Sequence, residues 1–226
     1  MPGLDLLVSD LYLSFAGQEV IALPQFQLPS GMLAVLAGPS GSGKSTLLYL
    51  LSGLLTPGRG QISWAGTDLA KLSGPSCDRW RRDNAGFIFQ DFHLFPELSP
   101  LDNVLAPAWF SALSAAPKRP TAQNLLDRLG VPQRRDTALL SRGEQQRVAI
   151  ARALLSDPAV IFADEPTASL DAASGTEVIT ILSGLARDQG RTIIAASHDP
   201  ALIAAADIVL RLDHGHSSVA LQEHAA

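Results

Sequence analysis

The sequence predicts an α/β fold with a mostly parallel sheet that helices cover on both faces. Short apolar, β-prone runs alternate with segments of helical periodicity along most of the 226 residues, and such alternation is typical of parallel sheets built from βαβ units. The central runs are continuously apolar, as is common for strands buried on both faces. With 46% hydrophobic and 17% charged residues, the composition is that of a globular protein.

The first third of the chain predicts strands of two kinds. The first two runs are bounded by turn signals, and we expect them to pair antiparallel in an N-terminal β subdomain. The third run is continuously apolar, which favours a buried parallel strand. A loop rich in glycine and serine then leads into a helix. In order, the expected elements are strands 6–15, 22–29 and 32–38, a helix 44–53, two short strands within 60–69 that turn at Ala65-Gly66, and a buried strand 85–90.

The pattern changes between residues 91 and 142. Six prolines punctuate short helical pieces such as residues 121–130, and proline interrupts helix interiors. We therefore expect an inserted α-helical subdomain over residues 91–142, with a small core of its own. The alternation then resumes with helices 143–157, 174–190 and 200–206 and strands 159–164, 192–198 and 207–215.

We expect residues 1–226 to form a single domain. Its core comprises residues 1–90, which include the β subdomain, and residues 143–215. The helical subdomain, residues 91–142, interrupts this core. The last stretch, residues 216–226, is expected to be a frayed tail.

Charge, cysteine content and hydropathy narrow the function classes. The net charge of −5 argues against a nucleic-acid partner, because nucleic-acid-binding domains present basic surfaces. The arginine-rich stretch 78–84 is expected to be the solvated face of a helix. The single cysteine, Cys77, excludes an internal disulfide and is expected as a small residue in a polar loop. No apolar run approaches the roughly 18 residues needed to cross a bilayer, so we expect the chain to dock on a membrane at most.

One stretch has the pattern of a phosphate-binding loop. It consists of Gly38, Pro39, Ser40, Gly41, Ser42, Gly43, Lys44, Ser45 and Thr46, which fits Gly, four residues, then Gly-Lys-Ser/Thr. The glycines allow a tight turn that brings backbone N–H groups against phosphates. Lys44 is expected to reach the β- and γ-phosphates of ATP and Ser45 to bind Mg²⁺, while the positive end of the following helix faces the same anion.

Two adjacent carboxylates end the predicted strand 159–164. Neighbouring residues on a strand point to opposite faces, but at the end of a strand the chain can turn both toward one site. We expect Asp164 to hold Mg²⁺, directly or through water, and Glu165 to polarise the attacking water. Without the phosphate-loop pattern, the same pair would be interpreted as a solvated acidic turn.

Five motifs in this order resemble those of the ATP-binding-cassette (ABC) ATPase family, over residues 4–212. The phosphate loop is the first, and FIFQ places Gln90 at the family's Q-loop. LSRGEQQRVAIARAL, residues 140–154, resembles the signature motif and its helix. DEPTASLD, residues 164–171, resembles the Walker B motif with the D-loop, and AASHD places His198 at the switch histidine. The resemblance implies a P-loop NTPase core.

The resemblance also implies a composite site between two copies of the chain. ATP would lie between the phosphate loop of one copy and the signature motif of the other, where Ser141 and the N–H of Gly143 would donate to the γ-phosphate. Asp171 would contact the partner chain. His198 would hold the γ-phosphate or orient the water, and Gln90 would link Mg²⁺ to the helical subdomain. Without this context, His198 and Gln90 would both be interpreted as structural residues.

Two positions in this pattern stay open. Phe15 falls where the family carries an aromatic residue that stacks on adenine, and Tyr12 is the rival candidate; either is otherwise an edge-strand or core aromatic. Arg142 stands where the signature motif usually has its first glycine, whereas Gly143 is retained. Arg142 must adopt a backbone that L-residues tolerate or carry strain of roughly 1–3 kcal/mol. Our hypothesis is that it adds positive charge near the nucleotide; neutral drift is the alternative.

Residues 72–107 resemble the lipoprotein-release and macrolide-export type of cassette, although Asp102 stands where Glu is usual. That type implies a peripheral ATPase on the cytoplasmic face of the inner membrane, which dimerises on ATP and drives a separate permease that sets the substrate. A cell-division type of cassette, which regulates a membrane complex without transport, is the alternative. Four apolar side chains are expected to form the groove for the permease's coupling helix or to serve the subdomain's own core: Phe92, Leu94, Phe95 and Leu98.

Overall fold

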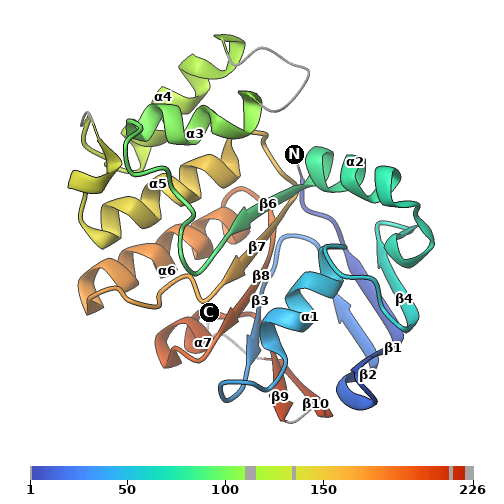
Figure 1. Cartoon of the computed structure of the whole chain (residues 1–226). Coiled ribbons are helices and arrows are strands. Elements are labelled where there is room, and N and C mark those ends of the chain that lie inside the picture. The colour runs from blue at the N-terminus through green and yellow to red at the C-terminus, as the bar shows by residue number, and fades with distance from the viewer. Residues whose placement is uncertain (1, 110–115, 134–135, 214–215, 222–226) are drawn as a thin grey trace.

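The computed structural model describes residues 2–109, 116–133, 136–213 and 216–221, and it contains two sheets (Figure 1). The central sheet has the strand order β10 (His216–Leu221), β9 (Ile208–Asp213), β3 (Leu33–Ala37), β8 (Thr192–Ser197), β7 (Val160–Asp164) and β6 (Ala85–Ile88). The second sheet has the order β2 (Gln18–Leu28), β1 (Leu6–Phe15), β4 (Arg59–Trp64) and β5 (Thr67–Asp68), with antiparallel pairing throughout. The predicted α/β fold class is confirmed.

Helices cover both faces of the central sheet. On one face lie α1 (Lys44–Leu51) and α2 (Gly74–Asn84), and on the other α5 (Arg142–Leu154), α6 (Ala172–Arg187) and α7 (Pro200–Ala205) (Figure 1). Helices α3 (Pro100–Trp109) and α4 (Arg119–Arg128) pack against α5. Short 3₁₀ helices are η1 (Leu69–Lys71), η2 (Ala116–Lys118) and η3 (Thr137–Leu139).

The strands of the central sheet are parallel except for β10, and every residue of β3, β7 and β8 is buried. Successive residues of a strand face opposite sides of the sheet, and β3 follows this rule. Ala34 and Leu36 belong to the buried cluster that includes α1, whereas Leu33, Val35 and Ala37 belong to the cluster with α5, α6 and α7. Burial on both faces explains why the sequence runs are continuously apolar.

The antiparallel sheet begins with a tight hairpin that the sequence analysis placed too late. β2 begins at Gln18, four residues before the predicted start, and Phe15 pairs directly with Gln18. The two residues between them, Ala16 and Gly17, have positive φ angles of 49° and 82°. A two-residue turn of this kind matches the right-handed twist of the flanking strands, so pairing extends to the turn itself.

The helical insertion has a buried cluster of its own. Val104 and Leu105 of α3 pack there with Leu126 of α4 and Val148 of α5. Helix α5 begins at Arg142, and Ser141 is its N-terminal cap residue. Its other face contributes Ile150 to the main core, so α5 joins the two parts. The division of the domain at residues 91 and 142 stays a prediction.

The expectation of a frayed tail over residues 216–226 is wrong for its first half. His216–Leu221 forms β10, which pairs antiparallel with β9 along its whole length. Without β10, β9 would present a row of unpaired backbone groups at the edge of the sheet, and an added strand satisfies them. Residues 222–226 of the predicted tail lie outside the described residues.

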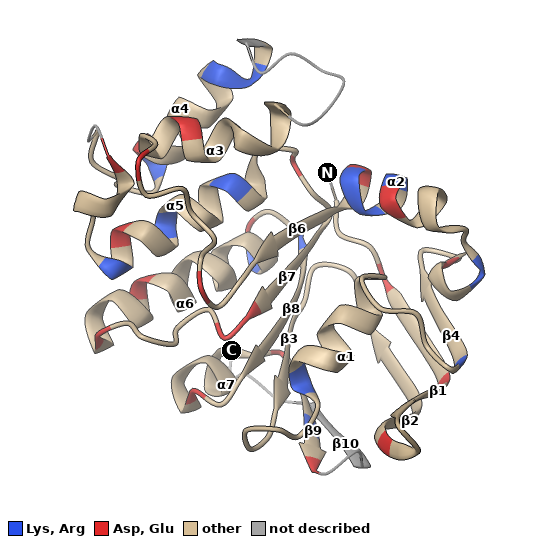
Figure 2. Cartoon of the chain, viewed as in Figure 1, with Lys and Arg blue, Asp and Glu red and all other residues tan. Residues whose placement is uncertain are grey.

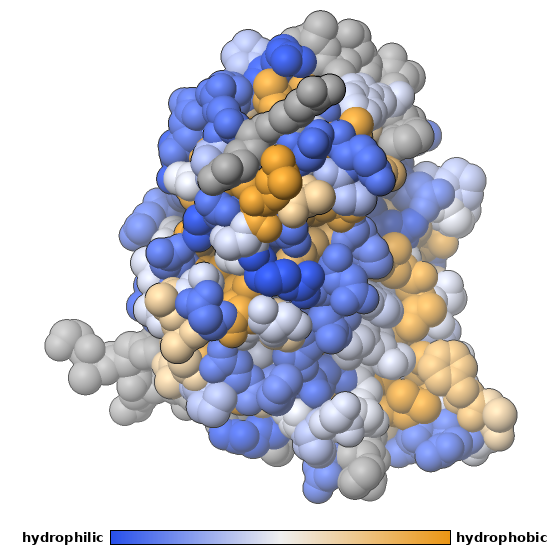
Figure 3. Space-filling model, turned by 60° about the vertical axis from the view of Figure 1, so that its left-hand side comes forward, coloured by the Kyte–Doolittle hydropathy of each residue, from blue (hydrophilic) through white to orange (hydrophobic). Residues whose placement is uncertain are grey.

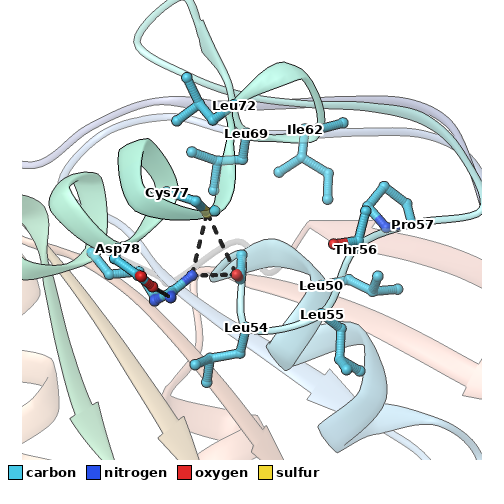
Figure 4. Close-up of a pocket in the computed structure, with 14 residues that line it drawn as sticks. Leu50, Leu54, Leu55, Thr56, Pro57, Ile62, Leu69, Leu72, Cys77 and Asp78 are labelled. Atoms are coloured by element: carbon cyan, nitrogen blue, oxygen red, sulfur yellow. Dashed lines mark hydrogen bonds and ion pairs between the residues drawn. The ribbon is translucent and has the colours of Figure 1, made fainter.

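Cys77 lies in α2 and is buried, so the expectation of a polar loop is wrong. Its Sγ atom is 3.5 Å from the carbonyl oxygen of Gly53, to which Arg81 also donates a hydrogen bond. These residues close one side of a 240 Å³ cavity between α1, β4 and α2 (Figure 4). The remainder of the arginine-rich stretch is a solvated helix face as expected, with Arg79 and Arg82 exposed.

Within the described ranges, no helix is both long enough and apolar enough to cross a bilayer. On the face shown in Figure 3, apolar side chains gather near the middle and along the right-hand side, with hydrophilic ones between them.

Candidate functional site

The phosphate-loop pattern lies where the chain passes from the central strand β3 into α1. Gly43 is the N-terminal cap residue of α1 and has a φ angle of 97°, which favours glycine. No side chain caps this helix, and its first turn carries no acidic residue. The first N–H groups of α1 are therefore left to bind an anion, which the helix dipole also favours.

Lys44 holds the loop together from within. Its ammonium group donates hydrogen bonds to the carbonyl oxygens of Gly38 and Pro39, each over 3.0 Å, and the side chain is buried. A side chain at Gly38 would place its Cβ atom 2.3 Å from the carbonyl oxygen of Leu212, so only glycine fits. The hydroxyl of Ser42 is buried without a hydrogen-bond partner among the described residues, which leaves one polar group of the loop available to a ligand.

Pro39, Ser40 and Gly41 form the exposed part of the loop, and Thr46 is half-buried in the first turn of α1. The loop therefore combines an exposed crest with a buried cation and free backbone donors. That combination fits the polyphosphate of a nucleotide.

Asp164 ends β7 and meets Ser45 in the first turn of α1. Figure 2 shows acidic residues in red at this end of β7. Its carboxylate is nearly buried and accepts a hydrogen bond of 2.8 Å from the hydroxyl of Ser45. Hard oxygen ligands of these two kinds fit Mg²⁺. Of the three residues expected at the metal, Ser45 and Asp164 thus lie side by side.

Tyr49 was missed by the sequence analysis. It lies one turn after Ser45 on α1, and its hydroxyl donates a hydrogen bond of 2.9 Å to the second oxygen of Asp164. Burial, followed by the hydrogen bond and the negative charge of Asp164, raises the pKa of Tyr49 to about 12. The hydroxyl therefore stays protonated at neutral pH. The i, i+4 spacing on α1 is the only sequence signal that could have indicated this residue.

Glu165 turns the chain at the end of β7. Its φ angle is 46°, which is unusual for a residue with a side chain, and its N–H donates to the carbonyl oxygen of Ala196 over 2.8 Å. The carboxylate lies 3.8 Å from the Lys44 ammonium and 3.0 Å from Nδ1 of His198. Non-glycine residues in this backbone region cluster at functional sites, where the surroundings hold them. Both carboxylates of the pair therefore reach the start of α1.

Gln90 lies at the edge of the site but makes no described contact with the other residues expected at the metal. β6 ends at Ile88, which pairs with Ala163, so Gln90 leaves the sheet at the same edge as Asp164 and Glu165. Its side chain is exposed, and none of the described contacts joins it to Ser45 or Asp164. The register brings Gln90 to the site's edge but does not bring its amide to the expected metal position.

The signature-like segment forms the start of α5. Ser141 is the cap residue, and its hydroxyl accepts from the N–H of Glu144 while the Glu144 carboxylate accepts from the N–H of Ser141. This reciprocal arrangement is a capping box. Arg142 has ordinary helical backbone as the first residue of α5, so the strain considered for it does not arise.

Gly143 and Asp171 also have structural roles within the chain. A Cβ atom at Gly143 would lie 2.5 Å from the hydroxyl of Ser174, so α5 and α6 approach closely there. Asp171 caps α6 and accepts from both the N–H and the hydroxyl of Ser174. These hydrogen bonds, the backbone one first, lower the pKa of the Asp171 carboxyl. Close packing at Gly143 and the hydrogen bonds of Asp171 are thus contacts within one copy, beside any contact across an interface.

Of the two aromatic candidates for the adenine, Phe15 is the more accessible. It ends β1 with 53% of its surface exposed. Its hairpin borders the phosphate loop, because a Cβ atom at Gly43 would meet Ile21 and the carbonyl of Val20. The guanidinium of Arg59 covers the ring of Tyr12 at 4.7 Å. The geometry therefore favours Phe15 as the stacking residue.

Comparison with known proteins gives consistent results. A family model described as "ABC transporter" matches residues 23–168. The lipoprotein-releasing system ATP-binding protein LolD of Shewanella sp. (strain MR-4) is 40% identical over 209 residues, which cover 92% of this chain and 90% of that protein. The macrolide export ATP-binding/permease protein MacB 1 of Aeromonas hydrophila is 42% identical over 199 residues, or 87% of this chain but only 31% of that longer protein.

Solved structures agree with these matches. The dimeric structure of MJ0796, a bacterial ABC transporter cassette, superposes with a TM-score of 0.86 at 29% identity, over 97% of this chain and 99% of that one. A dimeric post-hydrolysis state of MJ0796 with ADP and Pi superposes equally well, with the same TM-score, identity and coverage. The predicted resemblance and the predicted ATPase activity are confirmed: the chain belongs to the ABC transporter family as an ATP-binding and ATP-hydrolysing cassette.

Proposed function

We propose that this cassette dimerises on ATP with a second copy of itself and drives a separate membrane permease from the cytoplasmic face of the inner membrane. The observation that carries the proposal is that the two halves of the machinery lie apart in one copy. The phosphate loop leads into α1, which packs on β2, β3, β7 and β8, whereas Ser141 caps α5, which packs on α3, α4, α6 and β6. Ser141 is exposed, so it is accessible to a nucleotide that another copy holds.

A head-to-tail dimer would supply that nucleotide. The phosphate loop of one copy binds the triphosphate, and the exposed N-terminus of α5 in the other copy faces the γ-phosphate with Ser141 and the N–H of Gly143. Asp171 at the start of α6 lies beside this surface and contacts the partner. The dimeric MJ0796 cassettes support this arrangement. Loss of the γ-phosphate on hydrolysis removes the shared ligand, so the dimer opens.

The chemistry then follows from the contacts at the end of β7. Lys44 leaves the carbonyls that it holds and donates to the β- and γ-phosphates. Ser45 and Asp164 would hold Mg²⁺, and Gln90, which leaves the sheet at the same edge, would link it to the helical part. Bound Mg²⁺ would supply charge that offsets the phosphate oxygens. Glu165 accepts the proton of the attacking water as the water's oxygen bonds to the γ-phosphorus and the bond to the β-phosphate oxygen breaks. His198, 3.0 Å from Glu165, orients that water or the γ-phosphate.

Replacing Tyr49 with Phe is expected to weaken the metal site without unfolding it. The change leaves Asp164 with Ser45 as its only described hydrogen-bond donor, and loss of such an outer partner typically lowers metal affinity about 10- to 100-fold. The Mg²⁺ concentration for half-maximal ATPase should therefore rise by about tenfold or more, while the rate at saturating Mg²⁺ changes little. Tyr12→Phe is the matched control, because the chain has two tyrosines. Equal Mg²⁺ dependence in both variants would contradict the role of Tyr49.

A groove between α2, β6, α3 and α5 is the proposed docking site for the permease. It encloses 860 Å³, and Phe95, Pro107 and Ala108 line it with apolar atoms, while Lys118 and the ion pair of Arg82 with Asp83 flank it. The groove thus fits a short helix with an apolar side chain.

Four apolar residues were expected either to line a docking groove or to pack in the core of the helical subdomain, and the structure separates them. Phe95 is 47% exposed and lines the groove. Leu94 packs against the buried cluster of the helical part, and Phe92 is buried. Leu98 is half-buried, and its carbonyl oxygen accepts from Thr137. Only Phe95 therefore serves the proposed docking site.

Photo-crosslinking tests the proposal in membranes. A photoreactive phenylalanine analogue at position 95 should crosslink to an integral membrane protein with a permease domain, and Phe95→Glu should abolish co-purification of the two proteins. Leu7, which is 40% exposed on the β subdomain, provides the control position for both changes. A crosslink to a short division-type partner would favour the regulatory alternative. Crosslinks to soluble proteins alone would contradict membrane coupling.

A further inference from the structure

The loop that carries Gln90 continues into an unusual backbone segment. Phe92 and His93 are consecutive residues with φ angles of 59° and 48°. The left-handed region is unfavourable for residues with a Cβ atom and persists where surrounding contacts enforce it. Here the N–H of Phe92 donates to the carbonyl oxygen of Phe89, and the N–H of His93 donates to that of Asp91. These local hydrogen bonds span only two or three residues, so further contacts must hold the segment.

Two arginines of α5 supply those contacts. Arg152 donates to the carbonyl oxygens of Phe92 and His93. The guanidinium of Arg142 lies over the ring of Phe92, with 4.4 Å between its carbon and the ring centroid. Phe92 is only 3% exposed, whereas Arg142 is exposed. The arginine at the first turn of the signature helix therefore covers a buried side chain of the Gln90 loop.

We infer that Arg142 is a positioning residue that fastens the Gln90 loop to the first turn of α5 within one copy. This inference rests on the proposed function, in which Gln90 serves the nucleotide of its own copy and Ser141 the nucleotide of the partner. Because Ser141 directly precedes Arg142, and Gln90 lies two residues before Phe92, the contact joins the two elements. Glycine at position 142, usual in the signature motif, has no side chain that could make this contact.

The geometry favours this role over the hypothesis that Arg142 adds charge at the nucleotide. A cation placed over an aromatic face is directed toward that ring, and Phe92 belongs to the same copy. The side chain is thereby turned toward the helical insertion. Movement of the signature helix toward a partner's ATP would thus carry the Gln90 loop with it, and both sites of the dimer would respond together.

Hydrogen exchange measures the contact directly. Arg142→Ala should speed amide exchange in residues 89–95 by roughly three- to thirty-fold, the range that corresponds to losing one cation–π contact. Exchange in the phosphate loop, residues 38–46, should stay unchanged. Arg142→Lys, which keeps a cation over the ring, should restore slow exchange in part. Arg128→Ala, an exposed arginine on α4, is the matched control and should leave exchange in residues 89–95 as in the wild type.

ATPase kinetics measure how the contact between Arg142 and Phe92 affects hydrolysis. Arg142→Ala should lower kcat by roughly three- to thirty-fold with the KM for ATP changed by less than about twofold, because Gln90 acts on nucleotide that is already bound. Phe92→Leu removes the ring and keeps the charge, so it should have the same effect, and the double variant should add little to either. Thermal unfolding of each variant separates this effect from loss of the folded protein.

Several results would overturn the inference. If Arg142→Ala lowers kcat but leaves exchange in residues 89–95 unchanged, or if the effects of Arg142→Ala and Phe92→Leu add, Arg142 acts on the nucleotide instead. If exchange rises but kcat does not change, the contact exists without positioning Gln90. The exchange measurement requires no activity, so an inactive wild type would contradict the proposed function while exchange still decides whether Arg142 holds the loop.

Discussion

Replacing Glu165 with Gln is expected to reduce ATP hydrolysis by about 10²- to 10⁴-fold, the usual contribution of a general base, and to leave a stable ATP-bound dimer. The amide keeps the size of the side chain but cannot accept the proton of the attacking water. Nucleotide binding should survive, because Lys44 still holds the phosphates and Asp164 still meets Ser45. ATP then stays between the two copies.

Two measurements check this expectation. Phosphate release gives the rate, and light scattering after size exclusion gives the mass with saturating ATP and Mg²⁺. Glu97→Gln, at an exposed glutamate, is the matched control and should hydrolyse ATP like the wild type. A Glu165→Gln protein that stays monomeric at saturating nucleotide would contradict the composite site. An unchanged rate would show that Glu165 is not the base.

Much of the fold was predictable because local sequence and tertiary environment agree. β3, β7 and β8 are buried on both faces, so their residues are continuously apolar and easily recognised. The phosphate loop was equally predictable, since close packing restricts Gly38 and the helix start restricts Gly43. Where pairing depends on distant partners, prediction failed. Nothing local in His216–Leu221 indicates that β9 has a free edge to cover.

The candidate site shows the same limit at the level of side chains. Ser45 and Asp164 were identified from their motifs, but the hydrogen bond from Tyr49 to Asp164 depends on how α1 packs against β7. Arg142 was recognised as a departure from a motif, yet its position over Phe92 depends on a loop 50 residues earlier in the chain. Motifs therefore indicate which residues touch the ligand, whereas the residues that support them require the tertiary structure.

Replacing Lys44 with Ala is expected to lower the affinity for ATP by about 10²- to 10⁴-fold, because two hydrogen bonds from a charged group contribute about 1.5–3 kcal/mol each. Fluorescence anisotropy with a labelled ATP measures this change. In the nucleotide-free protein, the same ammonium holds Gly38 and Pro39. These carbonyls lie in the accessible loop and can bind water instead. Without nucleotide, the substitution should therefore lower the free energy of unfolding by no more than about 1 kcal/mol.

Thermal unfolding with and without ATP separates these two roles of Lys44. A ligand that binds only the folded state raises its stability by RT ln(1 + [L]/Kd), so a protein that has lost the affinity shows no shift with ATP. Lys71→Ala is the matched control, because Lys71 is 78% exposed and pairs only with Asp68 among the described ion pairs. It should keep the full shift. If Lys44→Ala unfolds early but keeps its ATP shift, Lys44 serves the loop's structure and the phosphates are bound by the backbone donors of α1.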